Sequence, residues 1–350
     1  MESTITQNWK KALTLAAKEA SSVHVIADSN LPEEYSFEVL ELCKAVSRTQ
    51  IINFKGGEDV KTLSKVSEIY LHLDKFGADR KSLVVCLGGG TITDLGGFAA
   101  STYQRGLKLA HLPTTVLAMV DAAIGGKTGV NTEMQKSFGL LKNQIGTFYN
   151  PIMVGINYGW LKSLDKSEVL SGWGEMVKHA LLEGGEYLER FIKVSPSLNN
   201  ISPLIMNSAR IKEAIVKRDE KENGERASLN LGHTIAHAIE SLAHDEGREL
   251  KHGVAVAWGL VFALDVSVEK MGLDRSKAKR LQGWIVSGMS EGLYADEANA
   301  VWNKMSKDKK NTKGNVTDVL ICENGEIVWD FVWERKEFTI LWEQFLERHV

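Results

Sequence analysis

Short apolar runs alternate with amphipathic stretches through the first half of the chain, and no other feature restricts the possible folds as strongly. The apolar runs lie at residues 23–26, 50–53, 82–87 and 107–111, and a long stretch with helical periodicity lies at 60–76. Runs of this length are typical of buried strands, and helical stretches between them are typical of a sheet wound between covering helices. The first half is therefore predicted to form an α/β domain.

The second half of the chain, from about Leu161 onward, has a mostly helical pattern. Asp165-Lys166-Ser167-Glu168 resembles a capping box at the start of a helix that runs to about residue 182. Residues 228–243 and 252–268 have the pattern of further helices, and the second is apolar on nearly every side, so we expect it to be buried. The chain is thus predicted to be of class α/β + α, with domains over 1–158 and 159–350.

Charge and cysteine content restrict the partners and the compartment. The 350 residues carry a net charge of −3, which gives no general attraction for nucleic acid or anionic membranes, so an anionic ligand needs a local cluster of cations. Cys43, Cys86 and Cys322 are odd in number and widely spaced, which indicates neither a disulfide framework nor a CxxC metal site. The N-terminal sequence lacks the features of a signal peptide, and no apolar run is long enough to span a membrane. We therefore expect a cytoplasmic protein.

Three glycines, Gly88-Gly89-Gly90, directly follow the apolar run at 83–87, and a helix is predicted from about Thr91. Glycines between a strand and a helix allow backbone amides to approach a pyrophosphate, which the helix dipole also attracts. The spacing is GxG and lacks the rest of the GxGxxG pattern. The sequence alone leaves two interpretations open, a phosphate-binding turn and an ordinary tight turn.

A second glycine-rich segment, Gly125-Gly126-Lys127-Thr128, resembles the end of a P-loop. A P-loop requires a glycine five positions before Gly126, and that position is Asp121, so a P-loop nucleotide-triphosphatase is excluded. A lysine in a glycine-rich turn is still well placed to contact a phosphate. The alternative is a solvated loop lysine.

One predicted helix carries Glu175, Lys178 and His179 on the same face, because their spacings are i, i+3 and i+4. The same helix has apolar surface, and an acid in a packed setting needs a cation or a metal as its partner. The alternative is a simple Glu175–Lys178 pair on the surface.

His233 and His237 lie one helical turn apart, a spacing that suits two ligands of one metal ion. The segment lacks the glutamate of HExxH, which disfavours a zinc protease, and either histidine alone could be a capping or core residue. A third histidine, His252, opens the apolar helix. Together Glu175, His233 and His252 would supply one carboxylate and two imidazoles with coordination positions left open, which suits a catalytic Zn²⁺ or a similar ion.

In their order along the chain, these segments resemble the dehydroquinate synthase family of sugar phosphate cyclases. The resemblance covers residues from about Glu58 to Asn311. The matching segments are GGGTITD (88–94), YQRG (103–106), PTT (113–115), DAAIGGKTGVN (121–131), KNQIGTFY (142–149), SGWGEMVKH (171–179), RASLNLGHTIAHAIE (226–240), HGVAVAWG (252–259) and DKKN (308–311). The ordered set is far more specific than any one motif.

The resemblance implies a Rossmann-like NAD-binding domain followed by a mostly α-helical metal-binding domain. It also implies the conversion of 3-deoxy-arabino-heptulosonate 7-phosphate to 3-dehydroquinate and phosphate. In that reaction NAD transiently oxidises the C5 alcohol, phosphate leaves by β-elimination, the ketone is reduced again, and an intramolecular aldol step closes the ring. NAD is regenerated, so there is no net redox change.

The resemblance further implies roles for individual residues. The implied ligands of Zn²⁺ or Co²⁺ are Glu175, His233 and His252. The implied NAD contacts are Glu58, Lys61, Gly89, Gly90, Asp94, Thr114, Thr115, Lys127 and Lys142. The implied substrate-pocket residues are Asp121, Lys127, Lys142, Asn143, Lys178, Lys212, Arg226, Asn230, His237 and Lys309 or Lys310. For His237 the spacing suggests a second metal ligand, whereas the resemblance implies a polar contact to the substrate. Arg105 is implied to reach the site of a neighbouring subunit, so we expect a homodimer that acts on a sugar-acid phosphate.

The register of Lys142 depends on an insertion. Ten residues, Thr132 to Leu141, separate Asn131 from Lys142, more than the family usually has, so Lys136-Ser137 is a rival for Lys142-Asn143. The sequence after Lys142 continues the family pattern and favours Lys142 and Asn143.

Two enzyme alternatives and one non-enzymatic alternative stay open. A metal-dependent polyol dehydrogenase of the glycerol dehydrogenase type would share the fold and would release NADH, but the lysine-rich pocket favours a phosphorylated acid. Another sugar phosphate cyclase would share the mechanism. A degenerate member that only binds NAD is disfavoured because every implied ligand and cation position is retained.

Overall fold

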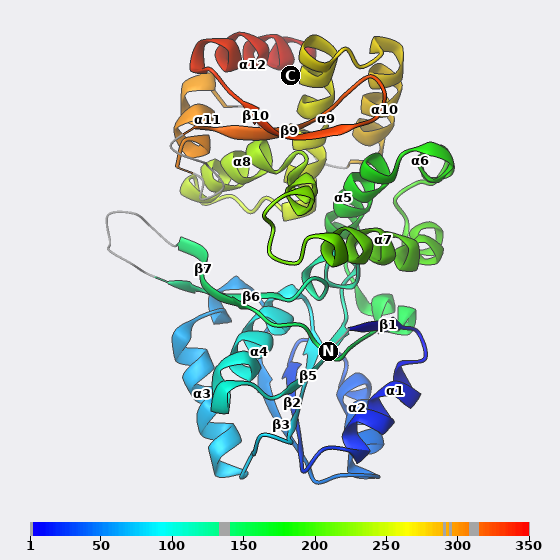
Figure 1. Cartoon of the computed structure of the whole chain (residues 1–350), viewed down its shortest axis with the longest axis vertical. Helices are drawn as coiled ribbons and strands as arrows, with labels where there is room; N and C mark the ends of the chain where they lie inside the picture. Colours follow the sequence, from blue (N-terminus) through cyan, green and yellow to red (C-terminus); the bar gives the residue numbers. More distant parts are fainter. Residues whose placement is uncertain (1–2, 133–140, 290–291, 294–295, 308–314, 350) are drawn as a thin grey trace. The chain divides into compact units, whose positions relative to one another are not determined.

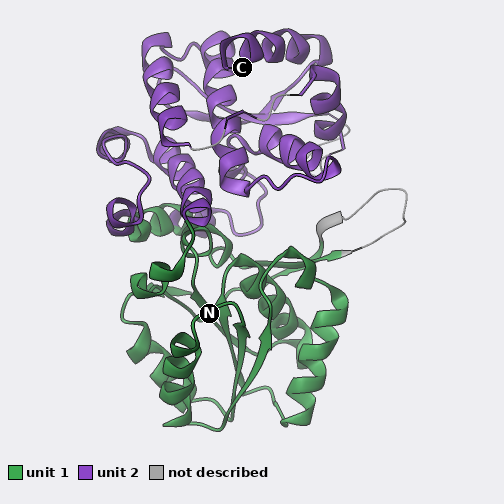
Figure 2. Ribbon diagram, turned by 180° about the vertical axis from the view of Figure 1, so that it is seen from behind, with its two compact units in different colours: residues 1–165, 205–213 green, residues 166–204, 214–350 purple. Residues whose placement is uncertain are grey.

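The computed structural model describes residues 3–132, 141–289, 292–293, 296–307 and 315–349. By their internal contacts, the residues group into two compact units, coloured separately in Figure 2. Unit 1 comprises Met1–Asp165 and Ile205–Glu213, and unit 2 comprises Lys166–Leu204 and Ala214–Val350. Unit 1 thus includes a segment from the second half of the chain, which lies inside the long helix α7 (Leu198–Arg218).

Unit 1 contains a six-stranded parallel sheet in the order β1-β8-β5-β4-β2-β3 (Figure 1). Its strands are β1 (Thr4–Thr6), β2 (Val23–Asp28), β3 (Thr49–Phe54), β4 (Leu83–Gly88), β5 (Lys108–Pro113) and β8 (Met153–Gly155). The four apolar runs of the sequence form β2, β3, β4 and β5, which confirms the predicted sheet. The two short strands β1 and β8, which extend the sheet beyond β5, were not predicted.

Helices cover both faces of this sheet (Figure 1). Successive side chains of a strand point to opposite faces, so each buried strand contributes to two cores. The helices are α1 (Trp9–Lys18), α2 (Glu33–Lys44), α3 (Leu63–Lys75) and α4 (Gly90–Thr102). In the central strand β4, Leu83, Val85 and Leu87 pack in the core with α1 and α2. Val84 and Cys86 pack in the core with α3 and α4. The sheet is therefore doubly wound, as the alternation of the sequence predicts.

Unit 1 also contains an antiparallel hairpin of β6 (Lys127–Thr132) and β7 (Leu141–Phe148), in which Lys127 pairs with Phe148. This hairpin was not predicted from the sequence. The short helical segments of this unit are η1 (Glu58–Val60), η2 (Tyr103–Arg105), η3 (Ala118–Ala122) and η4 (Tyr158–Ser163).

Unit 2 is mostly helical, as predicted. Its elements besides the ends of α7 are α5 (Lys166–Glu183), α6 (Gly185–Phe191), η5 (Glu225–Asn230), α8 (His233–Asp245), α9 (His252–Met271), α10 (Arg275–Gly288), α11 (Ala298–Met305), β9 (Thr317–Ile321), β10 (Ile327–Val332) and α12 (Arg335–His349). The antiparallel pair β9 and β10 was not among the elements predicted for this mostly helical half. No helix within the described ranges combines the length and apolar character that a membrane span requires.

Helix α9 lies in the core of unit 2. Its side chains are buried almost continuously from Gly253 to Leu264, which confirms the expectation drawn from its apolar sequence. The ring centroids of three aromatic residues lie within 6.0 Å of the ring centroid of Phe262, namely Trp333, Trp342 and Phe345. An apolar helix surrounded in this way is a rigid support for the residues at its ends.

Candidate functional site

Helices α5 and α9 approach each other closely at two glycines, Gly174 and Gly253. A Cβ atom at Gly174 would collide with the backbone of Gly253, and one at Gly253 would collide with the backbone of Ser171. Only residues without a Cβ permit this approach. Glu175 follows the first glycine and His252 precedes the second. The same backbone contact therefore brings these two side chains together.

Helix α8 joins them through a third glycine, Gly232. Its backbone is left-handed, with φ of 76°, and a Cβ atom there would lie 2.8 Å from the backbone nitrogen of Leu260 in α9. Both features favour glycine. Because α8 begins at the next residue, His233 lies in its first turn, against α9.

The three predicted metal ligands meet at one carboxylate oxygen. The Nε2 atoms of His233 and His252 lie 3.3 and 3.2 Å from Oε1 of Glu175. The candidate ligand atoms of all three residues lie within 4.8 Å of one another. Glu175 is fully buried, and His233 is nearly so. Three separate helices therefore assemble the set that the sequence predicted.

Each imidazole is held from its other side. The Nδ1 atom of His252 donates to Oε2 of Glu240 at 3.0 Å, and Nδ1 of His233 lies 3.2 Å from the carbonyl oxygen of Leu231. Contacts of this kind fix the ring orientation and leave Nε2 for a metal ion. Glu240 was not among the predicted site residues, although it lies seven residues after His233 and so on the same face of α8.

Charge at the site favours an ionised Glu175. Its Oε2 pairs with Nζ of Lys178, and both side chains are buried, so the pair lies in the interior and not on the surface. Burial opposes ionisation, but the charges of Lys178 and His233 outweigh it and hold the pKa of Glu175 well below its ordinary value. For His252, burial by itself lowers the pKa, but the carboxylates of Glu240 and Glu175 outweigh it and raise the pKa to about 10. The site therefore stabilises positive charge at the position of the imidazoles.

These donors fit a divalent metal ion. One carboxylate and two imidazoles, each imidazole held by an outer partner, form a ligand set suited to Zn²⁺ or Co²⁺ with further positions open to water or substrate. His237 lies beside this set, with its ring centroid 5.6 Å from that of His233 and 6.3 Å from that of His252. It is not a member of the group of mutually close ligand atoms.

A loop after α7 holds two more of the predicted residues. The carboxylate of Asp219 accepts from the backbone amides of Asn223, Gly224 and Arg226 at 2.8–3.0 Å. The buried Arg226 donates to the carbonyl of Glu220 at 2.5 Å. These contacts fix the course of the loop. Asp219 was not among the predicted site residues, because it belongs to no motif of its own.

The same loop places Asn230. Its Nδ2 donates to Oε1 of Glu222 at 3.2 Å, and Glu222 has a left-handed backbone with φ of 60°. A non-glycine residue in this conformation is strained, and such strain persists only where the surrounding structure enforces it.

In unit 1, the predicted glycine turn lies at the carboxyl ends of β4 and β5, which are neighbours in the sheet. Gly89 is the N-terminal cap of α4, and a Cβ atom there would lie 3.1 Å from the side chain of Thr115. The backbone amide of Thr114 donates to the carbonyl of Gly88 at 3.0 Å. The structure thus brings Gly89, Gly90, Thr114 and Thr115 together at the edge where ligands bind in wound sheets.

Two ion pairs lie among the predicted residues of unit 1. Nζ of Lys61 is 2.5 Å from Oδ2 of Asp94 in α4. Nζ of Lys212, from the α7 segment that belongs to this unit, donates to Oδ1 of Asp121 at 2.8 Å and to its carbonyl at 2.7 Å. Both lysines are buried. Position in the sequence gave no sign that Lys212 belongs to the same unit as Asp121.

The remaining predicted residues of unit 1 are Glu58, Lys127 and Arg105. Oε1 of Glu58 accepts from Nδ2 of Asn131 at 2.7 Å, which ties η1 to the hairpin. Lys127 is exposed at the start of β6, and Arg105 is exposed with φ of 68° at the end of η2. The side chains of Lys142 and Asn143 lie outside the described residues, as do Lys309, Lys310 and the rival pair Lys136-Ser137.

Two family models match the chain along most of its length. Residues 51–171 match the model for the N-terminal part of 3-dehydroquinate synthase, and residues 172–311 match the model for its C-terminal part.

Curated proteins are similar over nearly the whole chain. A 3-dehydroquinate synthase of Parabacteroides distasonis is 36% identical over 318 residues, which cover 89% of this chain and 88% of that protein. One of Pyrococcus abyssi is 40% identical over 334 residues, which cover 92% and 97%.

Solved structures share the fold at lower identity. A 2-deoxy-scyllo-inosose synthase, complexed with carbaglucose-6-phosphate, NAD⁺ and Co²⁺, has a TM-score of 0.84 at 22% identity and covers 97% of this chain and 96% of that one. A 2-epi-5-epi-valiolone synthase of Streptomyces hygroscopicus, with NAD⁺ and Zn²⁺ bound, has a TM-score of 0.78 at 21% identity, with 99% and 97% covered. An iron-containing alcohol dehydrogenase has a TM-score of 0.64 at 15% identity, with 99% and 98% covered.

Proposed function

The chain belongs to the 3-dehydroquinate synthase family, and from that premise we propose that it converts 3-deoxy-D-arabino-heptulosonate 7-phosphate to 3-dehydroquinate and phosphate. The observation that carries the proposal is the convergence of Glu175, His233 and His252. A carbon–oxygen lyase that removes phosphate through transient oxidation needs such a set beside its substrate.

We propose that Glu175, His233 and His252 hold Zn²⁺ or Co²⁺. When bound, such an ion polarises an alcohol oxygen and favours hydride loss from the same carbon. Glu240 keeps the proton of His252 on Nδ1, so that Nε2 presents a lone pair to the ion. Lys178 neutralises the second oxygen of Glu175.

We propose that NAD binds to unit 1 at the carboxyl edge of its sheet. Gly89 and Gly90 leave the first amides of α4 accessible to a pyrophosphate, and the helix dipole adds to the attraction. Thr114 and Thr115 border the same turn. Glu58, Lys61, Asp94, Lys127 and Lys142 are the further proposed contacts. A hydride that NAD accepts and then returns leaves no net oxidation.

The anionic substrate requires cations that the net charge of −3 does not supply. We propose Lys127 and Lys212 in unit 1, and Lys178 and Arg226 in unit 2, for its phosphate and carboxylate groups. Asp121 orients Lys212 through the 2.8 Å ion pair. Asn230 and His237 would make polar contacts, and Lys142, Asn143 and Lys309 complete the proposed set.

One assay tests this function. The purified protein is incubated with substoichiometric NAD⁺, Co²⁺ or Zn²⁺ and the heptulosonate phosphate, and phosphate and 3-dehydroquinate are both measured. We expect the two products in equal amounts, with many turnovers for each NAD. Substrate consumption matched by NADH accumulation would instead indicate a dehydrogenase, and failure of this substrate alongside turnover of a different sugar phosphate would indicate another cyclase.

We also propose that Arg105 serves a neighbouring subunit's site, so that the working form is a homodimer. Arg105 lies on a turn of left-handed backbone and is exposed, so it is accessible to a second subunit. Mixed dimers of Arg105→Ala and Lys178→Ala subunits should recover activity that neither variant has alone. No recovery in verified mixed dimers would contradict the proposal.

A further inference from the structure

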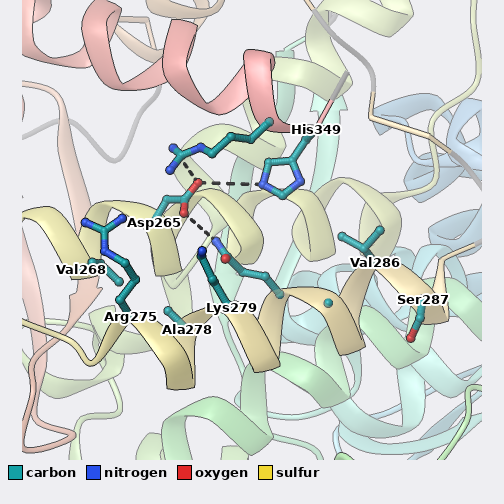
Figure 3. Close-up of a pocket in the computed structure, with 11 residues that line it drawn as sticks. Asp265, Val268, Arg275, Ala278, Lys279, Val286, Ser287 and His349 are labelled. Carbon is teal, nitrogen blue, oxygen red and sulfur yellow. Dashed lines mark hydrogen bonds and ion pairs between the residues drawn. The ribbon is translucent and has the colours of Figure 1, made fainter.

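A pocket of about 440 Å³ lies in unit 2 among α9, α10 and the end of α12 (Figure 3). Its polar lining residues include Asp265, Arg275, Lys279, Gln282 and Arg348. Along α9, Asp265 follows His252 by thirteen residues, which at 1.5 Å of helix rise for each residue is roughly 20 Å. The pocket is therefore separate from the candidate metal centre.

The charge of the lining favours an anion. Among the lining residues that the structure describes, three carry cationic side chains, Arg275, Lys279 and Arg348, and one, Asp265, carries a carboxylate. That carboxylate is already engaged, because Oδ2 lies 3.0 Å from Nη2 of Arg348 and Oδ1 accepts from Nε2 of Gln282 at 2.9 Å. In Figure 3 a dashed line also joins Asp265 to His349, whose Nε2 lies 3.9 Å from Oδ2. Asp265 therefore orients the wall of the pocket and is not left to bind a cation.

The other two cationic residues of the lining, Arg275 and Lys279, have weaker interactions with the rest of the protein. Arg275 pairs with Glu269 at 2.7 Å, but both side chains are largely exposed, so the pair contributes little. Lys279 has no hydrogen-bond or ion-pair partner within the part of the chain that the structure describes. Because they are four residues apart on α10, the two side chains lie on the same face and can bind one anion together.

A glycine in the lining has no explanation within the chain itself. Gly283 lies inside α10, where glycine is less favourable than alanine by roughly 0.5–1 kcal/mol. Its backbone does not have positive φ, and a Cβ atom there would have no neighbour within 4 Å. Neither backbone conformation nor close packing thus requires glycine here. Its effect is to keep open the space of the pocket.

The rest of the wall is apolar. Val268, Ala278 and Val286 line the pocket beside Gly283. A ligand that fits must therefore pair an anionic group with an apolar body, since a bare ion would leave this wall exposed to water.

We propose that this pocket is a second ligand site, which binds a small organic anion. Its phosphate or carboxylate group pairs with Lys279 and Arg275, and its apolar body lies over Gly283 and Val286. The site is independent of turnover at the candidate metal centre.

Calorimetric titration of the full-length, metal- and NAD-loaded protein with phenyl phosphate and with benzoate tests this proposal. We expect a binding isotherm for at least one probe, which Lys279→Glu weakens at least tenfold and Gly283→Leu abolishes by filling the pocket. The probe that binds more tightly identifies the anionic group. Lys277→Glu is the matched control, because Lys277 carries the same charge on the same helix but does not line the pocket.

The variants also separate this proposal from the proposed function. Lys279→Glu and Gly283→Leu should keep the turnover of the unaltered protein, which shows that they fold, and Lys279→Ala with the same loss of binding would exclude an effect of the introduced acid. Absence of binding by both probes would overturn the proposal. Equal binding by Lys277→Glu and Lys279→Glu proteins would overturn it as well.

Discussion

The ring of His252 bridges two carboxylates, with Nδ1 3.0 Å from Oε2 of Glu240 and Nε2 3.2 Å from Oε1 of Glu175. The two acids have different positions in the site. Glu175 is on the side where a metal ion would bind, whereas Glu240 contacts the opposite side of the imidazole. Glu240 is therefore a positioning residue, and its effect should be seen in metal affinity.

We expect Glu240→Gln to lower the affinity for Zn²⁺ by about ten- to a hundredfold, because loss of an outer-sphere carboxylate frees the ring and weakens the ligand. Competition with a chromophoric chelator measures this without reference to activity. Glu246→Gln, an exposed residue just after the same helix, is the control and should bind Zn²⁺ as the unaltered protein does. Equal affinities for the two variants would show that Glu240 does not position His252.

Local sequence patterns predicted those parts of the structure that depend on residues close together in the chain. The runs that became β2 to β5 and the apolar helix α9 follow from periodicity alone. The metal set Glu175, His233 and His252 could also be proposed from spacing and residue type. What brings these three together, however, is the close packing of Gly174 against Gly253, and no local pattern reveals which two glycines will meet.

Three parts of the structure depend on contacts between residues that are distant in the chain or on patterns that are very short, and local sequence patterns did not predict them. Lys212 joins unit 1 through its ion pair with Asp121, ninety-one residues earlier in the chain. Asp219 has its role because a loop folds back over its carboxylate. The hairpin β9–β10 pairs two short strands within a helical unit, where their periodicity is too brief to be distinctive.

Two buried histidines of unit 1 should make the protein less stable in acid. Burial lowers the pKa of His111 to about 3, and burial together with the charges of His72 and Arg48 lowers the pKa of His24 to about 4. The unfolded chain binds a proton at each below pH 6.5 while the folded chain does not, so folding is favoured above pH 6.5. Stability should then decline as the pH falls toward the folded values, by up to about 1.4 kcal/mol per pH unit for each imidazole.

Urea denaturation at several values between pH 7 and pH 5 measures this slope. We expect His111→Gln to reduce the slope of the unfolding free energy against pH. The reduction should correspond to about one bound proton, because the variant lacks a group that titrates only in the unfolded chain. His244→Gln, which alters an exposed histidine at the end of α8, is the control for replacing a histidine by glutamine. If the unaltered protein and both variants had the same slope, the acid sensitivity could not come from the lowered pKa of His111.

Asp219 should be needed for the geometry of the loop that carries Arg226 and Asn230. Asp219→Ala removes the acceptor of three backbone amides. If both residues contact the substrate as proposed, their misplacement should lower kcat/KM on the order of ten- to a hundredfold, with the loss mainly in KM. Zn²⁺ affinity should stay the same, because the loop contributes none of the three ligands.

Lys221→Ala is the control for this change, since it alters an exposed residue of the same loop. Steady-state kinetics with the heptulosonate phosphate would compare the two variants. A fall in kcat with KM unchanged would argue against a positioning role for Asp219.

Two glycine-to-alanine changes in unit 2 should have opposite effects on stability. Gly174→Ala places a Cβ atom against the backbone of Gly253, which no side-chain rotation can relieve, so α5 and α9 must move apart. We expect the free energy of unfolding to fall by about 1–3 kcal/mol, a typical penalty for overpacking. The shift should also separate Glu175 from His252 and weaken Zn²⁺ binding.

Gly283→Ala is the matched change inside another helix of the same unit, at a position where the added Cβ meets open space. It should raise the free energy of unfolding by about 0.5–1 kcal/mol, because alanine favours the helix and nothing obstructs it. Chemical denaturation of both variants, followed by Zn²⁺ titration, makes the comparison. If Gly174→Ala were as stable as the unaltered protein and bound Zn²⁺ equally well, the close approach of α5 and α9 could not be what assembles the metal centre.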